Sequence, residues 1–183
     1  MLNRISLAAA ACALVTAFSI AACGGGGNDK TTPTSAGQSP AATTTAATGG
    51  TADACKLMTA DDAAAALGGV TDIQQASPSN TAANGVSVSN CSYFAKEGVA
   101  SLLARKSSAG DAATQFDTAK KAATGAMDVA GVGEKAFYNP QIGQLNVLVK
   151  DTWLIVSAGE IGKPAPAPSQ PLIDAAKKAA ERV

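Results

Sequence analysis

The pattern of apolar and polar positions divides the chain into three parts. Residues 5–20 are uncharged and largely apolar, and they follow the positively charged Arg4. Residues 24–50 contain no aromatic residue and no aliphatic residue larger than alanine, so they cannot bury enough apolar surface to offset the entropy of ordering them. Regularly spaced large apolar residues return only after this segment. We therefore expect a flexible tether over residues 23–50 and a single folded domain over residues 51–183.

Apolar residues at helical spacing predict three helices in this domain. They lie over residues 59–67, 111–124 and 171–182. The side chain of Thr59 can cap the first helix, and two glycines follow its end. A proline-rich stretch separates the last helix from the segment before it.

Alternating apolar and polar residues predict six strands. We expect them in residues 70–75, 85–95, 99–108, 135–140, 144–151 and 152–159. Together with the helices they give the order α-β-β-β-α-β-β-β-α. This order predicts an α+β fold, in which helices pack on a twisted, mostly antiparallel sheet.

The apolar run at the start of the chain is too short to cross a membrane. As a helix, its 16 residues would span about 24 Å, less than the roughly 30 Å of a bilayer core. A positive start, a short apolar core and small residues at its end are typical of a secretory signal peptide. We therefore expect a signal peptide over residues 1–22, with an uncleaved helix as the alternative.

The segment "IAAC", residues 20–23, directly follows this run and resembles the lipobox of bacterial lipoproteins. The resemblance implies that Cys23 receives a lipid and becomes the first residue of the mature protein. Two or more acyl chains, such as palmitate, hold a protein firmly in a membrane. We therefore expect a lipid anchor on the extracytoplasmic side of the cell membrane, or in the outer membrane where the organism has one.

Two cysteines remain in the folded part of the chain, Cys55 and Cys91. An even pair in an exported, oxidising setting predicts a structural disulfide. The alternatives are a metal site and a redox pair. The sequence contains no histidine and no Cys-x-x-Cys, so the cysteines are a poor set of zinc ligands. We expect a disulfide and no metal.

The sequence offers few side chains for catalysis. Without histidine, Ser-His-Asp and Cys-His arrangements are excluded. The adjacent Asp61 and Asp62 suit the positively polarised start of a helix better than an acid–base pair. Residues 131–136, "GVGEKA", match a dinucleotide motif, but the "FYNP" that follows favours a strand rather than the helix which such a site requires. We expect a turn there, no cofactor and no enzymatic activity.

Charge and aromatic content exclude one class of partner. Lys+Arg and Asp+Glu both number 14, which gives a net charge of zero, and the chain has one Trp, two Tyr and four Phe. Nucleic-acid-binding proteins need a basic stripe or several aromatic side chains for base stacking. We do not expect nucleic acid as a partner.

The motifs of the domain resemble those of a known family. "DACKLMTADDAAAALGG", "CSYF" and "DVAGVGEKAFYNP" are similar to segments of small actinobacterial lipoproteins that are classed as a domain of unknown function. The resemblance implies a lipid-anchored α+β domain with one disulfide, allied to cystatin-like or PsbP/Mog1-like sheets. It supplies no catalytic residue, and Tyr93 stands where the family usually has tryptophan.

Three aromatic residues are candidates for a binding face. Phe137, Tyr138 and Trp153 lie at or near the starts of the late strands, and large aromatic residues anchor both cores and interfaces. Trp153 shares a strand face with Ile155, while the opposite face of that strand is apolar too. This strand is therefore either sandwiched, with Trp153 in the core, or exposed on one face to a ligand.

The expected function is binding without catalysis on the outer side of a membrane. The expected partner is another protein or an envelope polymer. The alternative is a carrier that encloses an apolar ligand or lipid between its helices and its sheet.

Overall fold

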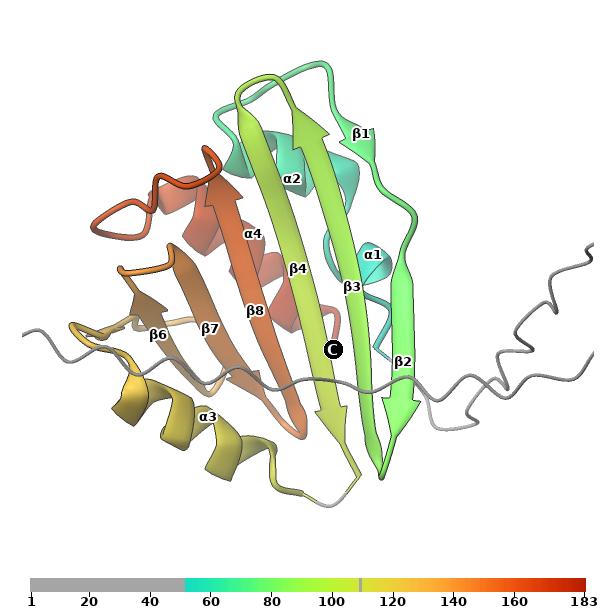
Figure 1. Ribbon diagram of the computed structural model, residues 1–183, viewed down its shortest axis with the longest axis vertical. Helices are drawn as coiled ribbons and strands as arrows, with labels where there is room; N and C mark the ends of the chain where they lie inside the picture. Colours follow the sequence, from blue (N-terminus) through green and yellow to red (C-terminus); the bar gives the residue numbers. More distant parts are fainter. Residues whose placement is uncertain (1–51, 109) are drawn as a thin grey trace, which may run out of the picture. The chain divides into compact units, whose positions relative to one another are not determined.

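The computed structural model describes residues 52–108 and 110–183. It shows an antiparallel sheet with helices on both of its faces (Figure 1). The α+β class predicted from the sequence is thereby confirmed. The predicted signal peptide, Cys23 and the predicted tether lie outside the described residues.

Eight strands make up the sheet, and every pair of neighbours is antiparallel. They are β1 (Gln74–Gln75), β2 (Ser79–Ala83), β3 (Val86–Ala95), β4 (Gly98–Ser107), β5 (Met127–Asp128), β6 (Lys135–Asn139), β7 (Gln144–Val149) and β8 (Thr152–Gly159). Their order across the sheet is β1-β3-β4-β8-β7-β6-β5, and β2 also pairs with β3. The pairing of β4 with β8 joins the early and late strands into one sheet.

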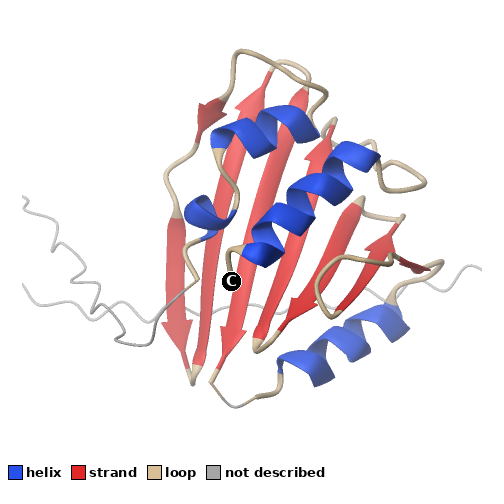
Figure 2. Ribbon diagram, turned by 180° about the vertical axis from the view of Figure 1, so that it is seen from behind, coloured by secondary structure: helices blue, strands red, loops and turns tan. Residues whose placement is uncertain are grey.

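Four helices accompany the sheet in the described part of the chain. They are α1 (Ala54–Leu57), α2 (Ala60–Ala66), α3 (Ala112–Ala122) and α4 (Gln170–Glu181). Figure 2 shows α1, α2 and α4 on one face of the sheet, and α3 packs on the other. The three helices expected from the sequence are α2, α3 and α4, while α1, β2 and β5 were not predicted.

The larger core lies between the sheet and the helices α1, α2 and α4. Tyr93 and Tyr138 are its largest side chains, each 1% exposed. The hydroxyl of Tyr93 donates a hydrogen bond to the carbonyl of Met58 at 2.6 Å. The predicted disulfide between Cys55 and Cys91 is present and joins α1 to β3. The hydrogen bond of Tyr93 and the disulfide therefore hold α1 and the residue that follows it against β3.

Strand β3 turns its more polar side towards this core. Ser89 is 1% exposed, and its hydroxyl accepts a hydrogen bond from the backbone N–H of Ala54 at 2.9 Å. The alternating pattern places Val88 and Phe94 on the opposite side, where Phe94 is 46% exposed. The more apolar face of β3 is thus the one that these three helices do not cover.

A smaller core lies beneath α3. Phe116 of that helix packs edge-on against Phe137, with ring centroids 5.1 Å apart, and against Trp153 at 6.4 Å. Leu148 is also buried in this cluster. Strand β8 is therefore sandwiched between the two cores at Trp153, which explains why both of its faces are apolar.

The "GVGEKA" segment forms a turn that leads into β6. Gly131 and Gly133 have φ angles of 73° and 57°, a region that side chains disfavour. A Cβ atom on Gly133 would lie 2.6 Å from the carbonyl oxygen of Leu148. Because a strand follows at Lys135, the segment lacks the helix N-terminus that a dinucleotide site needs.

Candidate binding surface

The face of the sheet that carries α3 is only partly covered. Figure 1 shows α3 near the end formed by β6 and β7, and within residues 52–108 and 110–183 no other helix lies on this face, so β3, most of β4 and much of β8 are left uncovered by the described elements. We call this uncovered region the open face. Its residues are Val86, Val88, Asn90, Ser92 and Phe94 of β3, Val99, Ser101, Leu103 and Arg105 of β4, Gln144 of β7, and Ile155 and Ser157 of β8.

The antiparallel register arranges these side chains in rows across the strands. Asn90, Leu103 and Ile155 lie opposite one another in one row. The next row contains Ser92, Ser101 and Ser157, and the last two hydroxyls share a hydrogen bond at 2.8 Å. The centre of the open face is therefore built from aliphatic, hydroxyl and amide groups without a charge.

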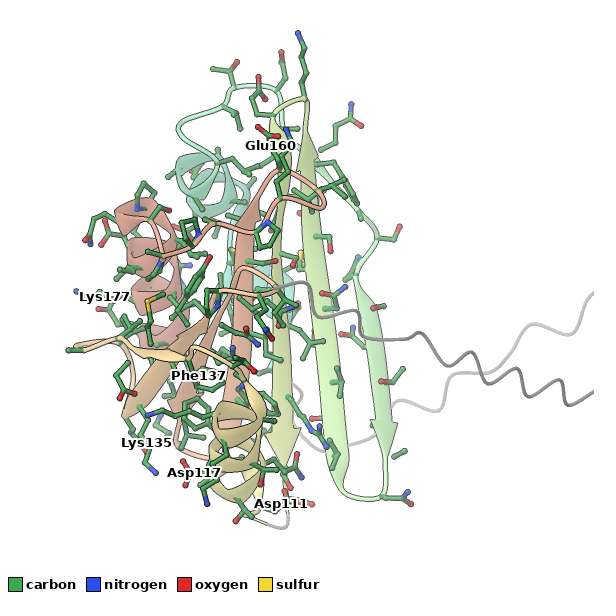
Figure 3. All side chains as sticks on the ribbon, turned by 60° about the vertical axis from the view of Figure 1, so that its left-hand side comes forward. Asp111, Asp117, Lys135, Phe137, Glu160 and Lys177 are labelled. Carbon is green, nitrogen blue, oxygen red and sulfur yellow. A yellow bond between two sulfur atoms is a disulfide. The ribbon has the colours of Figure 1, made fainter. Side chains whose placement is uncertain are left out.

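The one charged residue of the open face, Arg105, lies at its margin next to the start of α3. A hydrogen bond from Ser107 makes the largest contribution to lowering the pKa of Asp111. A hydrogen bond from Gln115 and the positive charge of Arg105 lower this pKa further. The Gln115 amide donates to the Asp111 carboxylate at 2.6 Å. Asp111, labelled in Figure 3, thus places a negative charge near Arg105, and the open face as a whole is close to neutral.

The three aromatic residues predicted for a binding face do not meet on one surface. Phe137 and Tyr138 are neighbours on β6, point to opposite sides of the sheet and are each 1% exposed. Phe137 lies between the sheet and α3 (Figure 3). Trp153 is half-buried, and its indole N–H donates to the side-chain oxygen of Asn146 at 3.1 Å. Of the three, Trp153 alone borders the open face.

A second uncovered feature lies at the end of the sheet where β3, β6 and β8 end. A pocket of about 450 Å³ opens there, and its lining includes Val99, Ile142 and Ile161. Ile142 is 56% exposed and Ile161 is 79% exposed. Phe94, which is 46% exposed, is paired with Val99. We call Phe94, Ile142 and Ile161 the apolar end.

Neither surface was predicted from the sequence. The open face depends on which strands become neighbours, and the strand patterns do not contain that information. The apolar end did leave a signal, because Ile142 and Ile161 are single large apolar residues in glycine-containing turns, "QIGQ" and "EIGK".

Asp62 is a buried carboxylate that belongs to the fold. It is 3% exposed and completes the capping box of α2 with Thr59. It also accepts from Arg182 Nη1 at 2.5 Å and pairs with Lys178 Nζ at 3.1 Å. Burial raises its pKa, but the hydrogen bonds from Arg182, Thr59 and Lys178 outweigh this effect and lower the pKa to about 2. The interpretation of Asp62 as a helix-start residue agrees with this geometry.

The exposed face of α3 carries paired charges. Lys135 Nζ lies 3.3 Å from Asp117 Oδ1 (Figure 3), and Lys120 is bonded to Asp128. These pairs line a shallow pocket of about 390 Å³. Because each carboxylate has a lysine partner, this pocket has the composition of a solvated helix face.

Two further features are absent from residues 52–108 and 110–183. Histidine, cysteine, aspartate and glutamate side chains do not gather there in a group that could hold a metal ion. The described helices include none with the length and apolar character needed to cross a membrane.

Comparisons of the chain with known protein families, with curated proteins and with solved structures found no match. The structure itself therefore defines the class of this protein, an α+β domain with a disulfide and an antiparallel sheet that the described helices cover only in part.

Proposed function

We propose that this chain is a lipid-anchored envelope lipoprotein whose domain binds a protein or an envelope polymer through the open face, without catalysing a reaction. The observation that carries this proposal is the composition of that face. Cores of protein interfaces are depleted in charged residues. Half-buried Leu103 and Ile155 lie in the uncharged middle of the open face, and half-buried Val88 lies next to Arg105. A sheet face that contacts only water usually carries polar and charged side chains instead.

The orientation of β3 adds to this argument. The strand buries Ser89, Cys91 and Tyr93 and directs its two valines and Phe94 outward. Contact with a partner would remove this apolar surface from water. The burial would stabilise the complex by about 25 cal/mol for each Å² of apolar surface. Hydroxyl and amide groups beside it can form hydrogen bonds with either a polypeptide or a polysaccharide.

Location on the outer side of a membrane is proposed from the sequence. The "IAAC" segment and the preceding apolar run support an anchor at Cys23, and the similarity to small actinobacterial lipoproteins points the same way. The disulfide between Cys55 and Cys91 suits an exported protein, because disulfides persist in oxidising compartments.

The carrier alternative has less support. A carrier would hold its ligand between the helices and the sheet, where Tyr93, Leu102 and Leu154 are at most 1% exposed. These side chains already fill that space. A ligand there would have to displace them.

The proposal can be tested by photo-crosslinking in the intact envelope. A photoreactive p-benzoylphenylalanine replaces Ser92 on the open face, and in a matched control it replaces the exposed Asp174 on α4. We expect an adduct of defined mass from position 92 and none from position 174, and Leu103→Asp should abolish it. Digestion of the adduct with a protease or with a glycosidase distinguishes a protein from a polymer.

The outcome that contradicts the proposal is equally clear. If position 92 yields no adduct, or both positions yield the same set of adducts, the open face is not a specific binding surface.

A further inference from the structure

We propose that the apolar end of the sheet docks onto the lipid bilayer in which the chain is anchored, an inference that rests on the proposed anchor at Cys23. The occupant of this surface is the boundary between headgroups and acyl chains. The docked domain would then present its open face beside the membrane rather than at a random orientation to it.

The residues of the apolar end come from three separate segments at the same end of the sheet. Phe94 is the penultimate residue of β3, Ile142 lies in the turn between β6 and β7, and Ile161 follows β8. Phe94 pairs with Val99, which pairs with Gly159, two residues before Ile161. Ile142 and Ile161 line the same pocket. Glu160, which marks this end in Figure 3, precedes Ile161.

The loops that carry the two isoleucines are fixed in place. The hydroxyl of Tyr138 donates to the carbonyl of Ala165 at 2.8 Å and so attaches the loop after β8 to β6. A Cβ atom on Gly143 would lie 3.3 Å from Pro164, so the two loops are in close contact. Ile142 and Ile161 are therefore exposed on a supported surface, and little ordering is needed before they bind.

The charges around the apolar end favour a neutral, apolar occupant. Lys96 and Glu97 lie in the turn after β3, and Lys163 pairs with Glu160 at 2.5 Å. The two lysines and two glutamates balance, so a strongly charged partner would gain little here. Insertion of apolar side chains at the membrane interface needs no net charge. The long lysine side chains next to them can extend their charged ends to the lipid headgroups.

The length of chain before the domain allows this contact. The bond from Ala54 to Ser89 fixes the start of the domain at the middle of β3. Phe94 lies five residues further along that strand, or about 17 Å at 3.3–3.4 Å per residue. The 27 residues from 24 to 50 are enough to bridge this distance, because a chain of that length can extend to roughly 90 Å. The apolar end can therefore reach the membrane that holds Cys23.

The tether also removes the need for high affinity. Three side chains give weak membrane binding by themselves, as single acyl chains do. A short flexible linker supplies an effective concentration on the order of millimolar. A weak contact at the apolar end is thus populated once the chain is anchored.

The test uses a chain that begins at Cys23, with its thiol coupled to a maleimide lipid in phosphatidylcholine vesicles. Hydrogen–deuterium exchange is then measured on the vesicle-bound and the free chain. We expect exchange in residues 140–143 and 160–163 to slow by at least about three-fold on vesicles, as it would if the docked state is occupied two thirds of the time. Vesicles with phosphatidylglycerol should give the same result, because the charges of this end balance.

Two matched variants make the result specific. Ile142→Asp with Ile161→Asp changes side chains that are 56% and 79% exposed, so the fold should persist and the protection should disappear. Ala113→Asp with Thr114→Asp adds the same charge at the exposed start of α3, and protection should remain. Equal exchange on vesicles and in solution, or protection that survives the double isoleucine variant, would overturn the inference. Since the coupling is chemical, this failure would leave the open face and the natural lipid anchor untouched.

Discussion

Arg182, next to the end of the chain, should contribute a measurable part of the domain's stability. Its Nη1 donates to the carbonyl of Leu57 at 2.6 Å and to Asp62 Oδ2 at 2.5 Å. It thereby links the end of α4 to the junction between α1 and α2. Replacement of Arg182 by methionine keeps most of the aliphatic stem and removes both bonds.

The pKa of the buried Asp62 carboxylate sets the size of the expected loss of stability. The pKa of Asp62 falls from 3.8 to about 2, and one pKa unit corresponds to about 1.4 kcal/mol. The ionised form of Asp62 thus stabilises the fold by about 2.5 kcal/mol relative to the protonated form. Arg182 makes the largest favourable contribution, and its bond to Leu57 adds to it. We expect Arg182→Met to lower the free energy of unfolding by about 2 kcal/mol at pH 7.

The pH dependence gives this prediction a second readout. Because the pKa of Asp62 is lower in the folded than in the unfolded chain, its stabilisation is complete above about pH 4 and is lost as the pH falls towards 2. The difference between wild type and Arg182→Met should therefore shrink as the pH falls through about 2, where half of Asp62 is protonated in the folded chain, towards the roughly 1 kcal/mol of the bond to the Leu57 carbonyl.

Urea unfolding followed by the fluorescence of the single tryptophan measures both quantities. The matched control is Lys163→Met, which breaks an ion pair with Glu160 of the same length, 2.5 Å, whose side chains are 76% and 60% exposed. Exposed pairs contribute little, so this variant should lose less than about 0.5 kcal/mol. Equal losses for the two variants, or a loss for Arg182→Met that is the same at pH 2 and pH 7, would refute the reasoning.

Three further predictions concern the disulfide, the tryptophan and the anchor. Replacing Cys55 and Cys91 together by alanine should lower the free energy of unfolding by roughly 2–5 kcal/mol, and free thiols in the exported protein would contradict the bridge. Trp153→Ala removes the edge contact with Phe116 and should cost about 2–4 kcal/mol in thermal unfolding, whereas a small loss of stability with a large loss of partner binding would make Trp153 a binding residue. Cys23→Ser should keep the mature chain out of the detergent phase in Triton X-114 partitioning, and a mature-length band in that phase would exclude the lipobox.

The strands and helices that the sequence predicted best are those whose pattern is local. Alternation and a short turn identify the hairpin of β3 and β4, and Thr59 identifies the start of α2. Strand β2 was missed because "SNTAA" has no alternation, and all five of its residues are exposed. It is a strand because β3 supplies the hydrogen-bonding partner, which no local pattern reports.

The candidate surfaces were harder to predict for a related reason. Alternation tells which residues of β3 share a face, but it does not tell which face meets the core. Hydrophobicity alone would bury Val86 and Val88. In the structure, the Cys55–Cys91 disulfide and the bond from Ala54 to Ser89 place the other face against α1. Contacts between residues more than thirty positions apart therefore determine which face of β3 meets the core.

This reversal has a physical reason that connects the fold with the proposed binding. Ala54 of α1 and Ala63 of α2 are fully buried in the core that meets this side of the sheet. Such small residues allow the helices to approach closely, and a valine in place of Ser89 would crowd that contact and leave the N–H of Ala54 without its acceptor. Val86, Val88 and Phe94 of β3 then lie on the open face, whereas Tyr93 fits into the core, where its hydroxyl donates to the carbonyl of Met58. A partner that covers Val88 or its aliphatic neighbours would bury apolar surface that the main core leaves partly exposed. The complex would then be stabilised by the hydrophobic free energy of that burial.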